Sequence, residues 1–294
     1  MSDTLESLQL KKESAAELQE VVSTMKALAA ANIGQYEHAV AALQDYHNTI
    51  LYGLKALVGR NQHVELAHSG TSETKRNKEM LVFGTDQGLA GNFNEILATF
   101  AKKEIGVVDG KVEVWAAGSR MLYSLQDEGF VVNALFDVPG SVNAITQFVT
   151  AVLIKIGQLP TNRLHEFYLV YNSPVHTGVY APRILRILPV DRDVTDNVAK
   201  LSWPTNNIPE APGNKQKTLT GLLDEYLFVT LYKACAESLS SENASRLAAM
   251  QRAEKNISDM LDDINQAYQR LRQNSIDEEL FDVISGFEAL KGKR

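Results

Sequence analysis

Apolar residues recur every three or four positions over about the last fifty residues of this 294-residue chain. Such spacing places their side chains along one side of an α-helix. No Pro or Gly interrupts residues 240–285, which at about 1.5 Å per residue would form a helix of roughly 70 Å. A lone helix cannot bury this stripe, so the pattern predicts a second long helix as its partner. The stripe consists of Ile257, Leu261, Ile264, Tyr268, Leu271, Ile276, Leu280, Ile284 and Phe287.

The partner is predicted at the other end of the chain, where one column of residues is spaced by seven. The column consists of Leu8, Ala15, Val22, Ala29, Tyr36, Leu43, Ile50 and Leu57. A second column, three residues further on, consists of Leu18, Met25, Ala39 and Tyr46, with Asn32 as a polar exception. This heptad predicts a left-handed coiled coil. We therefore expect an antiparallel coiled coil of residues 1–60 and 215–294.

The middle of the chain has a different period. Short apolar runs indicate strands, and each of the first three is followed by a helical segment. The expected strands are 80–83, 112–116, 131–138, 167–171 and 184–190, the fourth stopped by Asn172, Ser173 and Pro174. Asn92 or Asn94 and, later, Ser141 are candidate helix N-caps. Alternation of strands and helices predicts a Rossmann-like open α/β domain over residues 79–192, inserted between the two long helices. Residues 63–78 and 203–214 are expected to be exposed loops.

Composition excludes several classes of protein. A net charge of −7 argues against a nucleic-acid-binding protein. Cys235 is the only cysteine, so no internal disulfide can form. No uninterrupted run of 18 apolar residues occurs, which argues against insertion in a membrane. The acidic N-terminal region lacks the character of a leader or transit peptide.

Candidate chemistry is sparse. The glycine-containing segment 84–91 lies between a strand and a helix, where a phosphate could bind, yet it is neither a dinucleotide fingerprint nor a P-loop. The six histidines form no group with metal-ligand spacing. Acidic neighbours such as Asp262 and Asp263 point about 100° apart on a helix and are typical of a solvated face. We expect no catalytic residue, no cofactor and no metal.

Three segments carry a resemblance to a known family. Residues 84–94 read Gly-Thr-Asp-Gln-Gly-Leu-Ala-Gly-Asn-Phe-Asn, residues 241–250 read Ser-Glu-Asn-Ala-Ser-Arg-Leu-Ala-Ala-Met, and residues 267–280 include Arg-Leu-Arg-Gln-Asn-Ser-Ile-Asp-Glu-Glu. These segments, in this order, resemble the gamma subunit of F-type ATP synthases, and the likeness extends from end to end. Residues 24–30 are similar to the family's first motif, whereas 20–22 and 31–34 depart from that motif. Residues 203–212 depart from the aromatic and acidic segment by which relatives contact the membrane ring. These departures suggest a divergent bacterial branch.

The resemblance implies a central rotor shaft without an active site of its own. Its expected partners are the alpha/beta catalytic hexamer, the epsilon subunit and the membrane c-ring, at the cytoplasmic face of a bacterial inner membrane. The residues implied in subunit contacts are Met25, Lys26, Asp86, Gln87, Arg246, Arg272, Gln273, Asp277 and Glu279. Asp277 stands where the family has Thr. The residues alone also allow a coiled-coil tether with a globular head, or a small nucleotide-binding enzyme that uses segment 84–91.

Overall fold

The computed structural model describes residues 4–58, 77–105, 112–159, 165–176, 178–189, 202–203, 205, 207 and 214–291. Helix α1 (Leu5–Val58) begins the described chain and helix α6 (Lys215–Lys291) ends it, as the two striped segments predict. The chain divides into two compact units. The first contains residues 1–28 and 247–294, and the second contains residues 29–246. Each long helix therefore contributes to both units.

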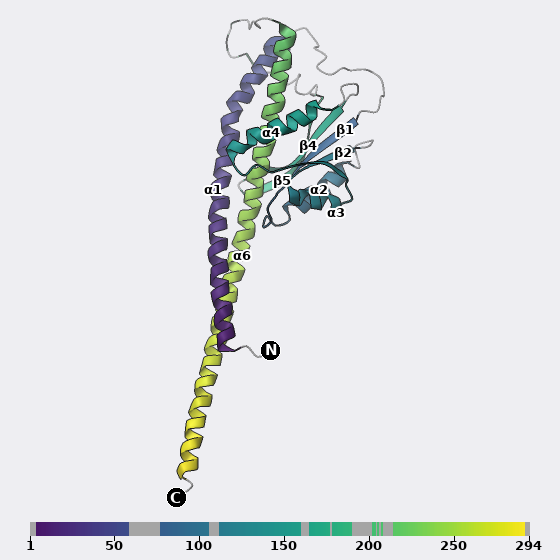
Figure 1. Cartoon of the computed structure of the whole chain (residues 1–294). Coiled ribbons are helices and arrows are strands. Elements are labelled where there is room, and N and C mark those ends of the chain that lie inside the picture. Colours follow the sequence, from purple (N-terminus) through teal and green to yellow (C-terminus); the bar gives the residue numbers. More distant parts are fainter. Residues whose placement is uncertain are drawn as a thin grey trace. The chain divides into compact units, whose positions relative to one another are not determined.

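The second unit contains a five-stranded sheet of order β3-β2-β1-β4-β5 (Figure 1). Its strands are β1 (Asn77–Phe83), β2 (Val112–Ala117), β3 (Val132–Phe136), β4 (His165–His176) and β5 (Val179–Leu188). The first four are parallel, and β5 pairs with β4 in the antiparallel sense. The predicted α/β sheet is thus present, with one antiparallel edge strand.

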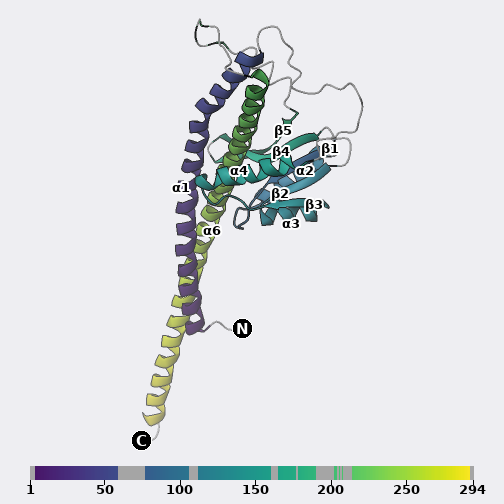
Figure 2. The same ribbon diagram turned by 45° about the horizontal axis from the view of Figure 1, so that its top comes forward.

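Helices cover both faces of this sheet, as the two views show (Figures 1 and 2). On one face, α2 (Phe93–Ile105) and α3 (Ser119–Asp127) pack against a cluster that includes Met80, Val82 and Ala116. On the other face, α4 (Val142–Gly157) packs with Leu81, Phe83 and Trp115. Because neighbouring residues of a strand point to opposite faces, β1 supplies both clusters from alternate positions. Residues of α1 and α6 complete the second cluster; they include Tyr36, Leu231, Cys235 and Leu239.

The two long helices pair in the antiparallel sense within each unit. In the first unit, Lys26 of α1 contacts Glu254 of α6; in the second, Tyr46 contacts Glu225. The heptad column is confirmed, because five of its members are at most 4% exposed: Leu8, Ala15, Ala29, Tyr36 and Ile50.

The second predicted column of α1 is wrong at both of its ends. Leu18 is 57% exposed and Tyr46 is 45% exposed. Its middle members Met25, Asn32 and Ala39 are half-buried. Covered positions also lie four residues after the heptad column, at Ile33, Val40 and Leu54. In the second unit Val40 packs against the core beneath the sheet. A helix that contacts a globular core as well as a partner helix needs this wider stripe.

Strand β4 is longer than expected, since it continues through Asn172 and Pro174 to His176. Strand β1 pairs with it only as far as Val170, so beyond that point β4 has a neighbouring strand on one side only. A proline is tolerated in that position because one set of backbone groups has no strand to bond. The last strand begins at Val179 rather than at residue 184 and forms a hairpin with β4.

Two predicted caps differ from the structure. Ser141 occupies the N-cap position of α4 but makes no capping hydrogen bond with its side chain. The side chain of Asn94 bonds to Thr85 in the preceding loop instead of capping α2. The expectations for residues 59–76 and for most of 203–214 fall outside the described residues.

Candidate functional site at the loop after the first strand

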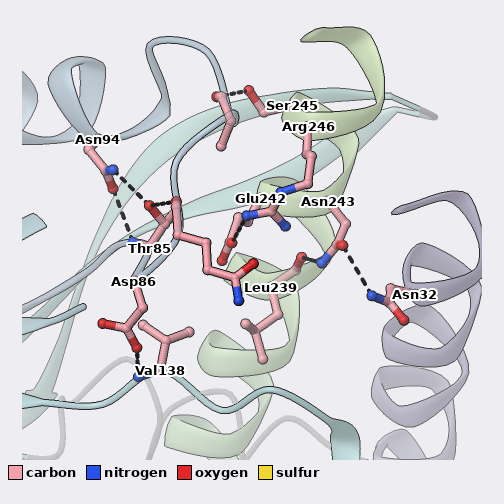
Figure 3. Close-up of polar contacts among 12 residues, drawn as sticks. Asn32, Thr85, Asp86, Asn94, Val138, Leu239, Glu242, Asn243, Ser245 and Arg246 are labelled. Atoms are coloured by element: carbon pink, nitrogen blue, oxygen red, sulfur yellow. Dashed lines mark hydrogen bonds and ion pairs between the residues drawn. The ribbon is translucent and has the colours of Figure 1, made fainter. Parts of the chain in front are cut away.

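The segment Gly84–Gly91 joins β1 to α2 and is held by hydrogen bonds of its own Thr85 and of Asn94 in α2 (Figure 3). The Thr85 amide donates a hydrogen bond to Asn94 Oδ1 at 3.1 Å, and Asn94 Nδ2 donates to Thr85 Oγ1 at 2.9 Å. Thr85 Oγ1 in turn donates to the Gln87 carbonyl at 2.8 Å. Thr85 is fully buried. These hydrogen bonds hold the loop in one conformation within the chain itself.

Asp86 ties this loop to two other segments of the α/β domain. Its Oδ1 accepts a hydrogen bond from the Ser119 amide at 2.7 Å, in the first turn of α3. Its Oδ2 accepts one from the Val138 amide at 2.7 Å. A carboxylate at a helix N-terminus satisfies free N–H groups and is favoured by the helix dipole. Both carboxylate oxygens of Asp86 are therefore used inside the chain.

Two glycines allow this close packing. A β-carbon on Gly84 would lie 2.3 Å from Met121 Cβ. Gly118 has a φ of 105°, and a β-carbon there would lie 2.6 Å from the Thr85 carbonyl oxygen. Any larger residue would push the loop away from the start of α3. Gly84 and Gly118 thus have a role in backbone packing that does not require a phosphate.

Helix α6 closes over the other side of the loop (Figure 3). Ser245 Oγ donates a 2.6 Å hydrogen bond to the Ala90 carbonyl and accepts one of 2.9 Å from the Tyr180 hydroxyl of β5. The Tyr180 ring also packs against Phe93, the first residue of α2, with ring centroids 5.5 Å apart. Ser245 therefore joins α6 to the loop and to the edge strand of the sheet.

An ion pair and an amide pair lie beside this contact. Arg246 bonds to Glu242 one helical turn earlier, with a nitrogen–oxygen distance of 2.6 Å. Asn243 Nδ2 donates to the Leu239 carbonyl at 2.8 Å, and its Oδ1 accepts from Asn32 Nδ2 of α1 at 3.4 Å. The amide pair links the two long helices at Asn32, the polar exception in the second predicted column of α1. A single polar pair in a coiled-coil seam fixes the register of its helices.

A cavity of about 140 Å³ lies among these groups. Asp86 and Gln87 of the loop and Arg246 of α6 all contribute to its wall, so the structure brings these three predicted residues together. The other lining residues are Asn32, Tyr36, Val138, Pro139, Gly140, Leu239, Glu242 and Asn243.

Burial shifts the titration of the groups around the cavity. Desolvation raises the pKa of Glu242, and the nearby Arg246 opposes that rise. Burial, with the charge of Glu242, raises the pKa of Tyr36 to about 12. Burial likewise raises the pKa of the Cys235 thiol. Tyr36 and Cys235 are therefore neutral at pH 7 and unsuited to nucleophilic chemistry.

Helix α6 lies where a Rossmann-like sheet would bind its ligand. In such sheets ligands bind beyond the carboxyl ends of the strands, where the strand order changes direction. That place lies between β1 and β4, because the chain adds β2 and β3 on one side and β4 on the other. Here α6 bonds to the loop after β1 through Ser245 and to Ser173 near the end of β4 through Glu237. The helix occupies the position of a ligand.

The other predicted contact residues lie in the first unit. Lys26 pairs with Glu254 at 2.6 Å, and Met25 beside it is half-buried. Arg272 and Gln273 are exposed on α6 and have no hydrogen-bond or ion-pair partner among the described residues. Asp277 and Glu279 are also exposed. No group of three His, Cys, Asp or Glu residues in the described ranges could hold a metal ion.

Several residues of this site were not predicted. Ser245, Tyr180 and Asn243 form its central bonds, yet sequence reasoning gave them no role. One signal was available for Asn32, because a polar residue in an apolar column predicts a polar partner. The pairing of Tyr180 with Ser245 had no such signal, since the two are separated by 65 residues.

The fold and this junction define a class: a two-helix protein with an inserted α/β domain whose ligand crevice is closed by its own last helix. The sequence model of the ATP synthase family matches residues 4–290. The ATP synthase gamma chain of Ruthia magnifica subsp. Calyptogena magnifica is 22% identical over 275 residues, which cover 92% of this chain and 94% of that one.

Solved structures share the fold. A chain of the Euglena gracilis mitochondrial ATP synthase OSCP/F1/c-ring structure, in rotational state 3, has a TM-score of 0.66 at 18% identity. That match covers 99% of this chain and 96% of the other. A chain of the Tetrahymena thermophila mitochondrial ATP synthase central stalk/c-ring structure has a TM-score of 0.58 at 16% identity, covering 79% and 99%.

This chain belongs to the gamma-subunit family of F-type ATP synthases, whose members form the non-catalytic rotor shaft of a membrane-associated complex. Among its described helices, none contains a stretch long and apolar enough to cross a membrane.

Proposed function

We propose that this chain turns inside an alpha/beta catalytic hexamer and couples its nucleotide chemistry to ion movement through a membrane c-ring. The mechanism is mechanical. An asymmetric shaft presents a different face to each catalytic site and so biases each site toward a different nucleotide affinity. The family match and the solved rotor and central-stalk structures of similar fold support this proposal.

One observation carries the proposal. Every residue from Ile276 to Gly286 on α6 is exposed, although the segment is rich in large apolar side chains. The exposed fractions are 53% for Ile276, 56% for Leu280, 68% for Phe281, 71% for Val283 and 46% for Ile284. Such a concentration of exposed apolar side chains indicates an interaction surface. A collar of the catalytic hexamer around this helix would bury them.

The polar residues just before this segment are proposed to form hydrogen bonds with the catalytic subunits. Arg272 presents five donors and Gln273 an amide, and both are exposed. Asp277 and Glu279 add exposed acceptors. Met25 and Lys26 on α1, with Gln87 and Arg246 at the junction, complete the proposed contact set. Asp86 belongs to it through the loop that it holds, because its carboxylate is occupied.

The α/β domain at residues 79–192 is proposed as the foot that binds the c-ring and the epsilon subunit. The complex would then lie at the cytoplasmic face of a bacterial inner membrane, with this chain peripheral to it. The two long helices, residues 1–60 and 215–294, would form the shaft domains.

Replacing Arg272 and Gln273 together by Ala tests the proposal. A hydrogen bond to a charged group is worth about 1.5–3 kcal/mol, so losing these contacts should lower coupled turnover about 10-fold or more. The isolated chain should keep its stability, because these side chains have no partner among the residues that the structure describes. Steady-state ATP hydrolysis and ion pumping of the reconstituted complex measure the effect.

The chain offers a matched control earlier on α6. Gln251 and Arg252 are the same residue types, are also exposed, and lie outside the proposed contact set. Replacing them by Ala should leave turnover close to wild type. Equal rates for both double variants and the wild type, with normal assembly, would show that Arg272 and Gln273 are ordinary surface residues.

A further inference from the structure

Helix α6 crosses the end of strand β4 at a place where two buried side chains lack hydrogen-bond partners. Asn172 of β4 is fully buried, and neither its Oδ1 nor its Nδ2 has a partner among the described residues. Ser241 of α6 is 1% exposed, and within the same part of the chain its hydroxyl also has none. Nearly all buried polar atoms of native proteins are bonded to protein groups or to ordered water, because an unpaired one destabilises the fold. Three polar atoms at this contact therefore require an explanation.

Contacts on both sides place Ser241 over the end of β4. Ser173 of β4 donates a hydrogen bond of 2.9 Å to Glu237 of α6. Tyr180 of β5 donates one of 2.9 Å to Ser245. Ser241 lies one helical turn from Glu237 and one from Ser245, so the three side chains share one side of α6. The turn of α6 between the two bonds therefore lies against the paired ends of β4 and β5.

Asn172 lies at the same place from the side of the sheet. It follows Val170 by two residues and so shares its face of the sheet, opposite Pro182 of β5. Tyr180 precedes Pro182 by two residues, lies on that face as well, and already reaches α6 through its hydroxyl. The neighbouring backbone offers Asn172 little, because β1 pairs with β4 only as far as Val170 and proline has no amide proton.

We propose that Asn172 and Ser241 form a binding site for buried water, the junction water, which links α6 to the end of β4. The water accepts a hydrogen bond from Asn172 Nδ2 and donates one to Ser241 Oγ. Buried water molecules usually bond to two to four polar groups, and water at such places is an integral part of the fold. The contact between α6 and the sheet is then water-mediated at Ser241 and direct on either side of it.

This site is separate from the 140 Å³ cavity described above. The α6 residues that line that cavity lie on another side of the helix; they are Leu239, Glu242, Asn243 and Arg246. The inference concerns the folded chain by itself and does not depend on the proposed function. Its tests therefore use the isolated full-length chain.

The sign of a stability change gives the first test. If Ser241 is bonded to the junction water, Ser241→Ala removes a paired group and should lower the urea midpoint of unfolding. If its hydroxyl were unpaired, the same change would leave the midpoint unchanged or raise it. Ser258→Ala is the matched control, because Ser258 is an exposed serine of the same helix. It should unfold as the wild type does, and circular dichroism measures all three midpoints.

A shared water also couples the two residues. Asn172→Ala should lower the midpoint as well, and the double variant with Ser241→Ala should lose less than the sum of the single losses. The reason is that either single change already releases the water. Additive losses would show that the two side chains have separate surroundings and would overturn the shared site.

Counting the buried water tests the site without reference to stability. Magnetic relaxation dispersion of ¹⁷O-labelled water detects molecules that stay inside a protein long enough to tumble with it. The signal of Ser241→Ala should fall below that of the wild type by the contribution of about one water molecule. Ser258→Ala should keep the full signal. Equal signals from the wild type and Ser241→Ala would overturn the proposal.

Salt substitution distinguishes water from a monovalent cation, the other occupant that oxygen atoms could bind. Unfolding is compared in sodium, potassium and choline chloride at equal concentration. For the junction water, the difference between the wild type and Ser241→Ala should be the same in all three salts. A wild-type midpoint that rises in sodium or potassium chloride, with no such rise in Ser241→Ala, would overturn the assignment to water.

Discussion

Two segments of helix α6 show opposite relations between polarity and burial. Between residues 238 and 245, six of eight residues are polar or charged and at most 6% exposed: Ser238, Ser240, Ser241, Glu242, Asn243 and Ser245. From Ile276 to Ile284, by contrast, the large apolar residues are at least 46% exposed. One continuous helix therefore buries its polar residues in one segment and exposes its apolar residues in another.

The difference reflects where each segment finds its partners. The polar segment bonds within the chain to the loop after β1, to β5 and to α1. Buried polar groups of this kind stabilise a structure only when they are paired, and they then fix one arrangement. The apolar segment has no such cover among the described residues. Mutations in the first segment should therefore act on folding, and mutations in the second on assembly.

The largest effect is expected from Arg246→Met in the buried ion pair. Removing one partner leaves the carboxylate of Glu242 buried without compensation, which typically costs about 3–5 kcal/mol. Chemical denaturation of the isolated chain at pH 7, followed by circular dichroism, measures this loss. The double variant Arg246→Met with Glu242→Gln should recover most of the stability, since no charge remains buried.

The same variant should depend on pH in a defined direction. The pKa of Glu242 is raised above its ordinary value of 4.5, mainly by burial, and without Arg246 it should rise further. A carboxyl with a raised folded-state pKa stabilises the fold fully below its unfolded pKa and loses this contribution as pH rises through the folded value. The defect of Arg246→Met should therefore shrink as pH falls from 7 toward 4.5. A constant defect over that range would contradict this assignment.

A smaller effect, about 2–3 kcal/mol, is expected for Ile264→Asp in the first unit. Ile264 is half-buried and lines a mostly apolar cleft with Leu10, Leu18 and Met260, so an Asp there would lose apolar contacts even though Lys11 also lines the cleft. Ile284→Asp provides the comparison, because Ile284 is 46% exposed. That change should alter the stability of the isolated chain by no more than about 0.5 kcal/mol yet lower coupled turnover of the complex. Equal unfolding midpoints of the two variants would contradict this difference between a half-buried and an exposed apolar position of α6.

The smallest effect concerns Ser245→Ala. The change removes the 2.6 Å bond to Ala90 and leaves the Tyr180 hydroxyl without its acceptor, at a cost of about 1–2 kcal/mol. Hydrogen exchange should show faster opening of the loop and of the hairpin of β4 and β5 while the other strands stay protected. Thr99→Ala, which removes an exposed bond to Glu128, should leave exchange in the loop unchanged.

Much of the fold could be predicted because long-range packing left local signals. The column of residues spaced by seven, from Leu8 to Leu57, marks the buried side of α1. Short apolar runs mark each strand. The second column was wrong at Leu18 and Tyr46, because spacing alone does not show which neighbouring positions the packing covers. The predicted end of the fourth strand before Asn172 was wrong, because residue propensities do not reveal that β4 has a neighbouring strand on one side only beyond Val170.

The site was less predictable, since its bonds join residues distant in sequence. Asp86 was selected through resemblance, but its partners at Ser119 and Val138 are 33 and 52 residues away. The backbone conformation of Leu89, with a φ of 66°, was not predicted, because a sequence does not reveal a positive φ at a residue other than glycine. Segment 84–91 was predicted to lie between a strand and a helix, and only the structure shows the atoms that would clash with a side chain on Gly84 or Gly118.

Rotation of this chain inside the catalytic hexamer tests the central claim most directly. Cys235 is the only cysteine and is buried, so a cysteine introduced at the exposed Asp127 would carry a probe at one defined place. With the hexamer immobilised and ATP supplied, we expect the probe to rotate in one direction at a rate that follows ATP hydrolysis. A probe that stays fixed while the same complexes hydrolyse ATP would contradict the claim that this chain is the rotor shaft.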